Sequence, residues 1–180
     1  MILQLTLFDT HAKWIANKVS FLEKKGHPFN SPSFTHIQKN IRTVIKIENN
    51  ELLVEIKSAG AEMTRIYSKK TQLEYLWKGD PTFWGRHAPV LFPIVGQVKN
   101  KTYKVNGDDF HLPQHGFARD NEFKLLTQEV DEVTFELTDS DEIAKVYPFK
   151  FALLVNYRLS VNELFINYKV INKDNKEIMF

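Results

Sequence analysis

The sequence predicts an all-β protein, an antiparallel sandwich preceded by a helical extension, and three observations support this fold class. From Arg42 onward the apolar segments are short and alternate apolar with polar residues, which is the pattern of half-buried strands. Turn signals such as Asn106-Gly107 separate these segments. The strands do not alternate with longer helical segments, so the pattern favours an antiparallel sandwich over a doubly wound parallel sheet.

The first predicted element is one amphipathic helix that begins near Thr10 and ends at Lys25. Asp9 or Thr10 can cap its start, and Gly26 stops it. Residues 27–33 contain two prolines, two serines and an asparagine, which neither a helix nor a central strand accommodates well. Residues 1–42 are therefore interpreted as a helical leader and linker, and residues 43–180 as the sandwich portion.

The strands follow in order along the remaining chain. Alternation predicts strands near residues 44–47 and 52–56, separated by a turn at 48–50. Asn106-Gly107 predicts a hairpin, because both residues tolerate a positive φ. Ser140 followed by acidic residues predicts one or two helical turns before Pro148. Further strands are predicted at 133–137, 151–159 and 164–171.

Composition and charge exclude several classes of function. The 24 Lys and Arg residues nearly balance the 22 Asp and Glu residues, and the signs are interspersed, so no nucleic-acid partner is expected. No apolar stretch approaches the roughly 20 residues that span a bilayer, and no membrane partner is expected. The absence of cysteine excludes disulfides, thiolate zinc sites and cysteine nucleophiles. Because the first residues also lack the pattern of a signal peptide, we expect a cytoplasmic protein.

Two stretches, residues 81–96 and 111–119, carry the residues suited to chemistry. Both mix aromatic rings, prolines, glycines and cations, which are residues that build rigid turns. Sugar rings have apolar faces that rest on aromatic side chains, and their hydroxyls hydrogen-bond to planar or forked donors. The set suited to such a ligand is Trp84, Arg86, Gln114, His115 and Phe117.

Simpler readings apply to the same residues. Phe83, Trp84, Phe92 and Phe117, taken singly, are expected in the core because large aromatic residues are usually buried. Arg86 and Arg119 could be solvated or paired surface groups. His111 and His115 are four residues apart, but Pro113 lies between them and no carboxylate pair completes a coordination shell, so no metal site is expected.

Four motifs give a family resemblance when they are read in order. They are Gly60-Ala61-Glu62, Tyr75-Leu76-Trp77, an arginine (Arg86) before the run Pro89–Gly96, and the run Leu112–Arg119. Together they resemble the aldose 1-epimerase, or galactose mutarotase-like, family and its LacX-like branch, over roughly residues 43–180.

The resemblance implies an antiparallel β-supersandwich that converts α to β anomers of an aldose or hexose phosphate without a cofactor. It implies that His115 contacts sugar oxygens near the reacting centre as a catalytic and binding residue. It implies that Arg86 and Arg119 hold sugar hydroxyls or a phosphate, and two converging guanidinium groups would favour phosphate. The expected partner is therefore a small sugar or sugar phosphate.

The resemblance also implies a second histidine as acid and a glutamate as base, and neither has a counterpart among the 180 residues. We therefore expect a truncated, N-terminal portion of the fold with weak or no activity, whose uncovered strands promote self-association. A non-catalytic carbohydrate-binding module is the alternative.

Overall fold

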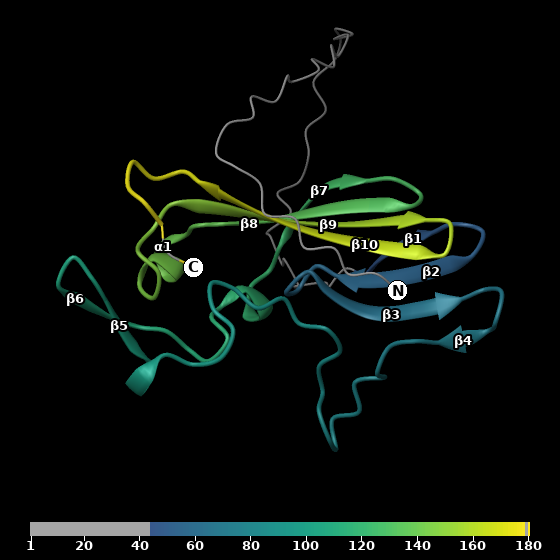
Figure 1. The fold of residues 1–180 in the computed structure, drawn as a ribbon, viewed down its shortest axis with the longest axis horizontal. Helices are drawn as coiled ribbons and strands as arrows, with labels where there is room; N and C mark the ends of the chain where they lie inside the picture. The colour runs from purple at the N-terminus through teal and green to yellow at the C-terminus, as the bar shows by residue number, and fades with distance from the viewer. Residues whose placement is uncertain (1–43, 179) are drawn as a thin grey trace, which may run out of the picture.

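A computed structural model describes residues 44–178 and 180 of the chain (Figure 1). The predicted helix near residues 10–25 and the linker after it lie outside the described residues. Among the residues that are described, no helix is both long enough and apolar enough to cross a membrane.

The first sheet contains four antiparallel strands in the order β1-β2-β3-β4. The strands are β1 (Val44–Glu48), β2 (Leu52–Lys57), β3 (Glu62–Ser68) and β4 (Leu73–Glu74). Every second residue of β2 is buried, as the alternation predicts. The turn before β2 is held by the side chain of Asn49, which accepts hydrogen bonds from the amides of Glu51 and Leu52.

The second sheet is also antiparallel, in the order β10-β9-β8-β7. Its strands are β7 (Lys124–Gln128), β8 (Glu132–Thr138), β9 (Phe151–Ser160) and β10 (Glu163–Asn172). Strands β9 and β10 pair without interruption over their whole length. Both belong to the segments whose alternation predicts strands, and the prediction is confirmed.

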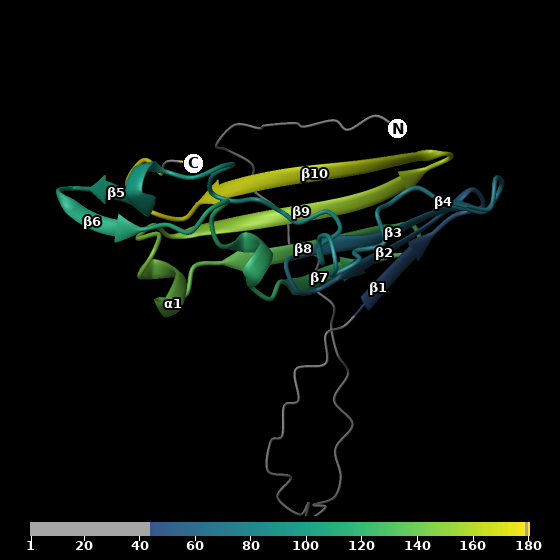
Figure 2. The same cartoon turned by 90° about the horizontal axis from the view of Figure 1, so that it is seen from below.

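Short elements lie between the strands of the two sheets. Strands β5 (Thr102–Val105) and β6 (Asp108–His111) form the predicted Asn106-Gly107 hairpin, which projects at the end of the molecule away from the β3–β4 turn (Figures 1 and 2). Helix α1 (Asp141–Ala144) begins where expected, and the Ser140 hydroxyl accepts a hydrogen bond from the Ile143 amide at 3.3 Å. Two 3₁₀ turns, η1 (Lys99–Lys101) and η2 (Ala118–Asp120), complete the elements.

The two sheets enclose one core and touch at both ends. At one end the Glu48 amide donates to the Val130 carbonyl at 2.7 Å, and at the other the Phe123 amide donates to the Ser58 carbonyl at 3.0 Å. The inward side chains of β8 and β9 are almost completely buried: Val133, Phe135, Leu153, Val155, Tyr157 and Leu159. The all-β sandwich is therefore confirmed.

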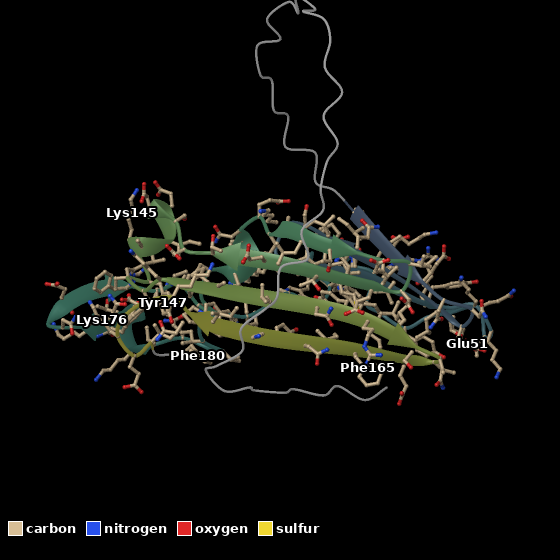
Figure 3. All side chains as sticks on the ribbon, turned by 90° about the horizontal axis from the view of Figure 1, so that it is seen from above. Glu51, Lys145, Tyr147, Phe165, Lys176 and Phe180 are labelled. Atoms are coloured by element: carbon tan, nitrogen blue, oxygen red, sulfur yellow. The ribbon has the colours of Figure 1, made fainter. Side chains whose placement is uncertain are left out.

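A cluster of aromatic rings fills one end of this core. The ring of Phe92 lies 5.9 Å from that of Phe117 and 6.0 Å from that of Tyr147, and the rings of Tyr147 and Phe151 are 5.7 Å apart. Figure 3 places Tyr147 near one end of the long β9–β10 hairpin and Phe165 near the other. The cluster ties the loops of residues 89–96 and 111–119 to the sandwich.

The core prediction for four aromatic residues is half right. Phe92 and Phe117 are each 5% exposed, as expected, whereas Phe83 is 80% and Trp84 50% exposed. The amides of Phe83 and Trp84 both donate to the Asp80 carbonyl, which places these two residues in a turn outside both sheets. The ring of Phe83 instead meets that of Trp77, 6.5 Å away and nearly perpendicular.

Candidate functional site

The two motif-bearing stretches cross and are joined backbone to backbone. The amide of Phe117 donates to the Phe92 carbonyl at 2.9 Å, and the amide of His115 donates to the Gly96 carbonyl at 2.7 Å. Phe92 and Gly116 also form an isolated parallel β-bridge. We call residues 89–96 together with 112–119 the crossed loops; they fix where His115 and Arg119 lie.

Glycine is required at the crossing point. Gly116 has a φ of +71°, and a Cβ atom there would overlap the Phe92 carbonyl oxygen. No side chain fits such a gap without moving the backbone of one loop. Residue 116 is therefore glycine because the loops touch there.

The side chain of His115 is held by a backbone amide of the other crossed loop. Its Nδ1 accepts a hydrogen bond from the Gly96 amide at 2.9 Å. A ring nitrogen that accepts carries no proton, so the neutral imidazole has its hydrogen on Nε2. His115 is thus arranged as a hydrogen-bond donor through Nε2, which suits contact with an oxygen of a ligand.

An open cleft of about 710 Å³ lies beside the crossed loops. Three chain segments form its walls: the end of β2, the turn that leads to Arg86, and residues 119–122. The charged and aromatic residues of its lining are Lys57, Trp84, Arg86, Arg119, Asp120 and Glu122.

One carboxylate joins the two predicted arginines in this cleft. Nη2 of Arg86 lies 2.5 Å from Oδ1 of Asp120, and Nε of Arg119 lies 3.5 Å from Oδ2 of the same carboxylate. Nη1 of Arg86 also donates to the Arg119 carbonyl oxygen at 3.2 Å. Arg86 and Arg119 thus approach the same carboxylate, with Asp120 between them.

The loop that carries Arg119 approaches the first sheet closely at Gly60. The φ of Gly60 is +73°, and a Cβ atom there would lie 2.8 Å from the Arg119 carbonyl oxygen. The amide of Gly60 donates to the Asn121 carbonyl at 2.7 Å. The loop of Arg119 is thus fastened to the chain between β2 and β3.

The other two predicted site residues, Gln114 and His115, are not part of the cleft wall. The Gln114 carbonyl oxygen accepts a hydrogen bond from Nη2 of Arg119 at 2.9 Å, and the Gln114 residue is exposed. His115 is not among the residues that line the cleft. The structure thus brings Arg86 and Arg119 together and links Gln114 to them through its backbone.

Three residues near the cleft were missed by the sequence reasoning: Lys57, Glu62 and Asp120. Asp120 directly follows the Leu112–Arg119 motif, and Glu62 ends the Gly60-Ala61-Glu62 motif. Their positions beside or within the motifs were the available signals in the sequence. Neither position shows which side chain the carboxylate contacts in the fold. Lys57, at the end of β2, gave no signal of its own.

Glu62 is fully buried, yet its carboxyl group is held in the ionised form. Burial alone would raise its pKa, but hydrogen bonds from Lys57 and from the His87 amide more than offset that effect. The pKa of Glu62 therefore lies below its ordinary value. The carboxylate accepts from the amides of His87 and Ala88 at 2.6 and 3.2 Å.

Metal ligands do not gather in the described part of the chain: residues 44–178 and 180 contain no group of three or more His, Asp or Glu side chains placed to hold an ion. The cations and amides of the cleft are hydrogen-bond donors suited to sugar hydroxyls or an anion.

Comparisons with known proteins agree with this fold. The aldose 1-epimerase family model matches residues 43–180. The chromosomal protein LacX of Lactococcus lactis subsp. lactis is 34% identical over 140 residues, which cover 75% of this chain and 46% of LacX. The chain thus spans about half the length of the curated relatives it matches.

Solved structures match the same portion. A galactose mutarotase related enzyme from Lactobacillus acidophilus has a TM-score of 0.74 and 46% identity, over 76% of this chain and 45% of that one. A galactose mutarotase-like protein from Lactobacillus casei has a TM-score of 0.73 and 38% identity, over 76% of this chain and 46% of that one. The chain belongs to the aldose 1-epimerase family.

Proposed function

We propose that residues 43–180 form part of a mutarotase-like β-sandwich domain whose cleft binds an aldose or a hexose phosphate. The whole protein would then interconvert the α and β anomers of that sugar in carbohydrate metabolism, in the cytoplasm. The observation that carries the proposal is the meeting of Arg86 and Arg119 in one cleft. Family membership supports it.

The lining of the cleft fits a sugar chemically. Trp84 is half exposed at the wall and offers an aromatic face to the apolar side of a sugar ring. Arg86 and Arg119 offer forked donors for hydroxyl or phosphate oxygens. Asp120 already engages both guanidinium groups, so a phosphate has to compete with it, whereas a sugar hydroxyl can hydrogen-bond to all three.

Anomer exchange requires two proton transfers. A base removes the proton of the anomeric hydroxyl while an acid protonates the ring oxygen; the ring C–O bond breaks, the carbonyl carbon rotates, and the ring closes on its other face. His115 donates through Nε2, because its Nδ1 already accepts from Gly96. We assign it to holding a sugar oxygen near the reacting carbon.

The second histidine and the glutamate that the family resemblance implies for proton transfer have no counterpart among these 180 residues. Each positioned proton-transfer group typically contributes about 10²–10⁴-fold to a rate. We therefore expect the 180-residue chain to bind sugar and to accelerate exchange weakly or not at all.

The proposal is tested by titrating glucose, galactose and glucose 6-phosphate while following tryptophan fluorescence. We expect saturable binding of at least one sugar, weakened about tenfold or more by Arg86→Gln, because a charged hydrogen-bond donor is lost. Arg158→Gln is the matched control, since Arg158 stacks on Phe165 of the second sheet. No saturable signal with any of the three sugars would contradict the proposal.

A non-catalytic carbohydrate-binding module is the second candidate. The observation in its favour is that Glu62 and Asp120, the carboxylates that meet cleft cations, are already engaged and not free to act as bases. Anomer-exchange NMR on the same three sugars tests it. Exchange well above that in buffer, lost in His115→Ala, would reject the module, whereas saturable binding without exchange agrees with both candidates for these 180 residues.

A further inference from the structure

Glu62 is a buried carboxylate that contacts one cleft residue, Lys57, and the backbone that directly follows another, Arg86. Its Oε2 lies 2.5 Å from Nζ of Lys57, which lines the cleft. Its Oε1 accepts from the amides of His87 and Ala88, and His87 directly follows Arg86. One carboxylate therefore contacts the ammonium group of Lys57 and also the backbone amide of His87, which directly follows Arg86.

The sheet geometry makes these contacts possible. Lys57 and Glu62 are paired partners at the adjacent ends of β2 and β3. One residue further along β3, Met63 forms an isolated β-bridge with Ala88. The segment that carries Arg86 is thus held against β3 by the Met63–Ala88 bridge and by the Glu62 side chain.

The electrostatics point the same way. Desolvation penalises a fully buried charge, so Glu62 stays ionised only through the donors that surround it. Lys57 and Arg86 are the cations that act on it, one from β2 and one from the loop. The chain keeps a buried charge here although a well-packed apolar side chain would avoid the cost of desolvation.

We propose that Glu62 is the positioning residue of the cleft: its carboxylate fixes the backbone from which Arg86 projects and holds the Lys57 ammonium group at the cleft wall. Lys57 is then a third direct contact for sugar or phosphate oxygens, beside Arg86 and Arg119. This inference rests on the proposed function for its ligand, but the positioning itself is measurable without one.

The ligand-free test compares Glu62→Gln with the wild type by NMR. We expect the amide signals of His87 and Ala88 and the guanidinium Nε signal of Arg86 to shift in Glu62→Gln, because a neutral amide oxygen is a weaker acceptor than a carboxylate. Glu55→Gln is the matched control: Glu55 lies on β2 and pairs with Arg65 at 3.4 Å, away from the cleft. Unchanged His87 and Arg86 signals in folded Glu62→Gln would overturn the positioning role.

The ligand test titrates the same variants with galactose and glucose 6-phosphate. We expect Glu62→Gln to weaken binding about tenfold or more, the size expected when charge-assisted hydrogen bonds lose their geometry, and Glu55→Gln to leave it unchanged. Ile47→Val loses stability in the core without touching the cleft, and we expect it to bind as the wild type does. Equal losses in Glu62→Gln and Ile47→Val would assign Glu62 to stability alone and overturn the proposal.

A second variant keeps the inference testable if Glu62→Gln does not fold. Lys57→Arg preserves the charge that pairs with Glu62 but replaces a compact ammonium group by a larger planar fork. We expect its affinity for glucose 6-phosphate to change about threefold or more with unchanged stability. An unchanged affinity would remove Lys57 from the site. If the wild type binds neither sugar, the proposed function fails, while the His87 and Arg86 signals still decide the positioning role.

Discussion

The sandwich and the crossed loops are built by opposite means. In the sandwich, strands that follow one another in sequence pair along ladders of many hydrogen bonds, and β9 and β10 match residue for residue over their whole length. The crossed loops lie outside the strands, and single backbone hydrogen bonds join residues such as Phe92 and Phe117. The sandwich spreads its stability over many contacts, whereas the loops, and with them the cleft, depend on a few.

The largest effect is expected from a change in the core of the sandwich. Phe135→Ala removes a fully buried ring from β8, and we expect it to lower the free energy of unfolding by about 3–5 kcal/mol. Urea denaturation followed by circular dichroism measures this. Phe165→Ala on β10, only partly buried, is the control and should cost clearly less. Similar losses for both would contradict the assigned core.

The second change is made in the crossed loops. Gly116→Ala puts a Cβ atom against the Phe92 carbonyl at a residue with positive φ, and we expect a loss of about 2–3 kcal/mol together with loss of sugar binding. Gly107→Ala is the matched control, because φ is also positive there but the space around it is open. It should cost about 1–2 kcal/mol from backbone strain alone and leave binding intact. Equal effects of the two would show that the contact with Phe92 does not matter.

A smaller effect is expected from a change at the carboxylate between the two arginines of the cleft. Asp120→Asn removes the carboxylate that competes for Arg86 and Arg119, and we expect the affinity for glucose 6-phosphate to rise about 3–10-fold. Stability should change by less than about 1 kcal/mol, because the pair is largely exposed. Parallel titrations with galactose and glucose 6-phosphate give the readout. Weaker phosphate binding would mean that Asp120 orients the arginines instead of competing for them.

The smallest effect concerns the hairpin that joins the loops to the sandwich. Burial raises the pKa of Tyr103 to about 12, and its hydroxyl donates to the Val146 carbonyl at 2.8 Å. Because the pKa is higher in the folded state, the contribution of Tyr103 to stability is complete below pH 10 and is lost as the pH rises toward 12. Urea midpoints between pH 9 and 12 should therefore fall less steeply in Tyr103→Phe than in the wild type. Identical slopes would contradict this burial.

Much of the sandwich could be predicted because its information is local. Alternation in residues 151–159 and the hydroxyl of Ser140 each act over a few residues, and both predictions are confirmed. Strand β7 was missed because all five of its residues are exposed and its pairing with β8 shifts register between Leu125 and Thr127. An irregular, exposed edge strand has no alternation to detect.

The site could be predicted only in part because its geometry is not local. Arg86 and Arg119 were named from their motifs, and their roles stay proposals. Their common partner Asp120 is 34 residues from Arg86, and no periodicity reports such a contact. The exposure of Phe83 and Trp84 was equally invisible, since it depends on how one turn folds around Asp80. Composition identifies residues suited to a ligand, but the tertiary contacts decide which of them face it.

The pairing of acids with bases around the cleft also bears on how fast a ligand arrives. Lys57, Arg86 and Arg119 supply three positive charges, and Asp120, Glu122 and the buried Glu62 supply three negative ones. A region with no net charge exerts little long-range attraction, so a phosphorylated sugar gains little electrostatic steering on its approach. The association rate of glucose 6-phosphate should then vary little with ionic strength, and discrimination between sugars would arise from dissociation rates instead.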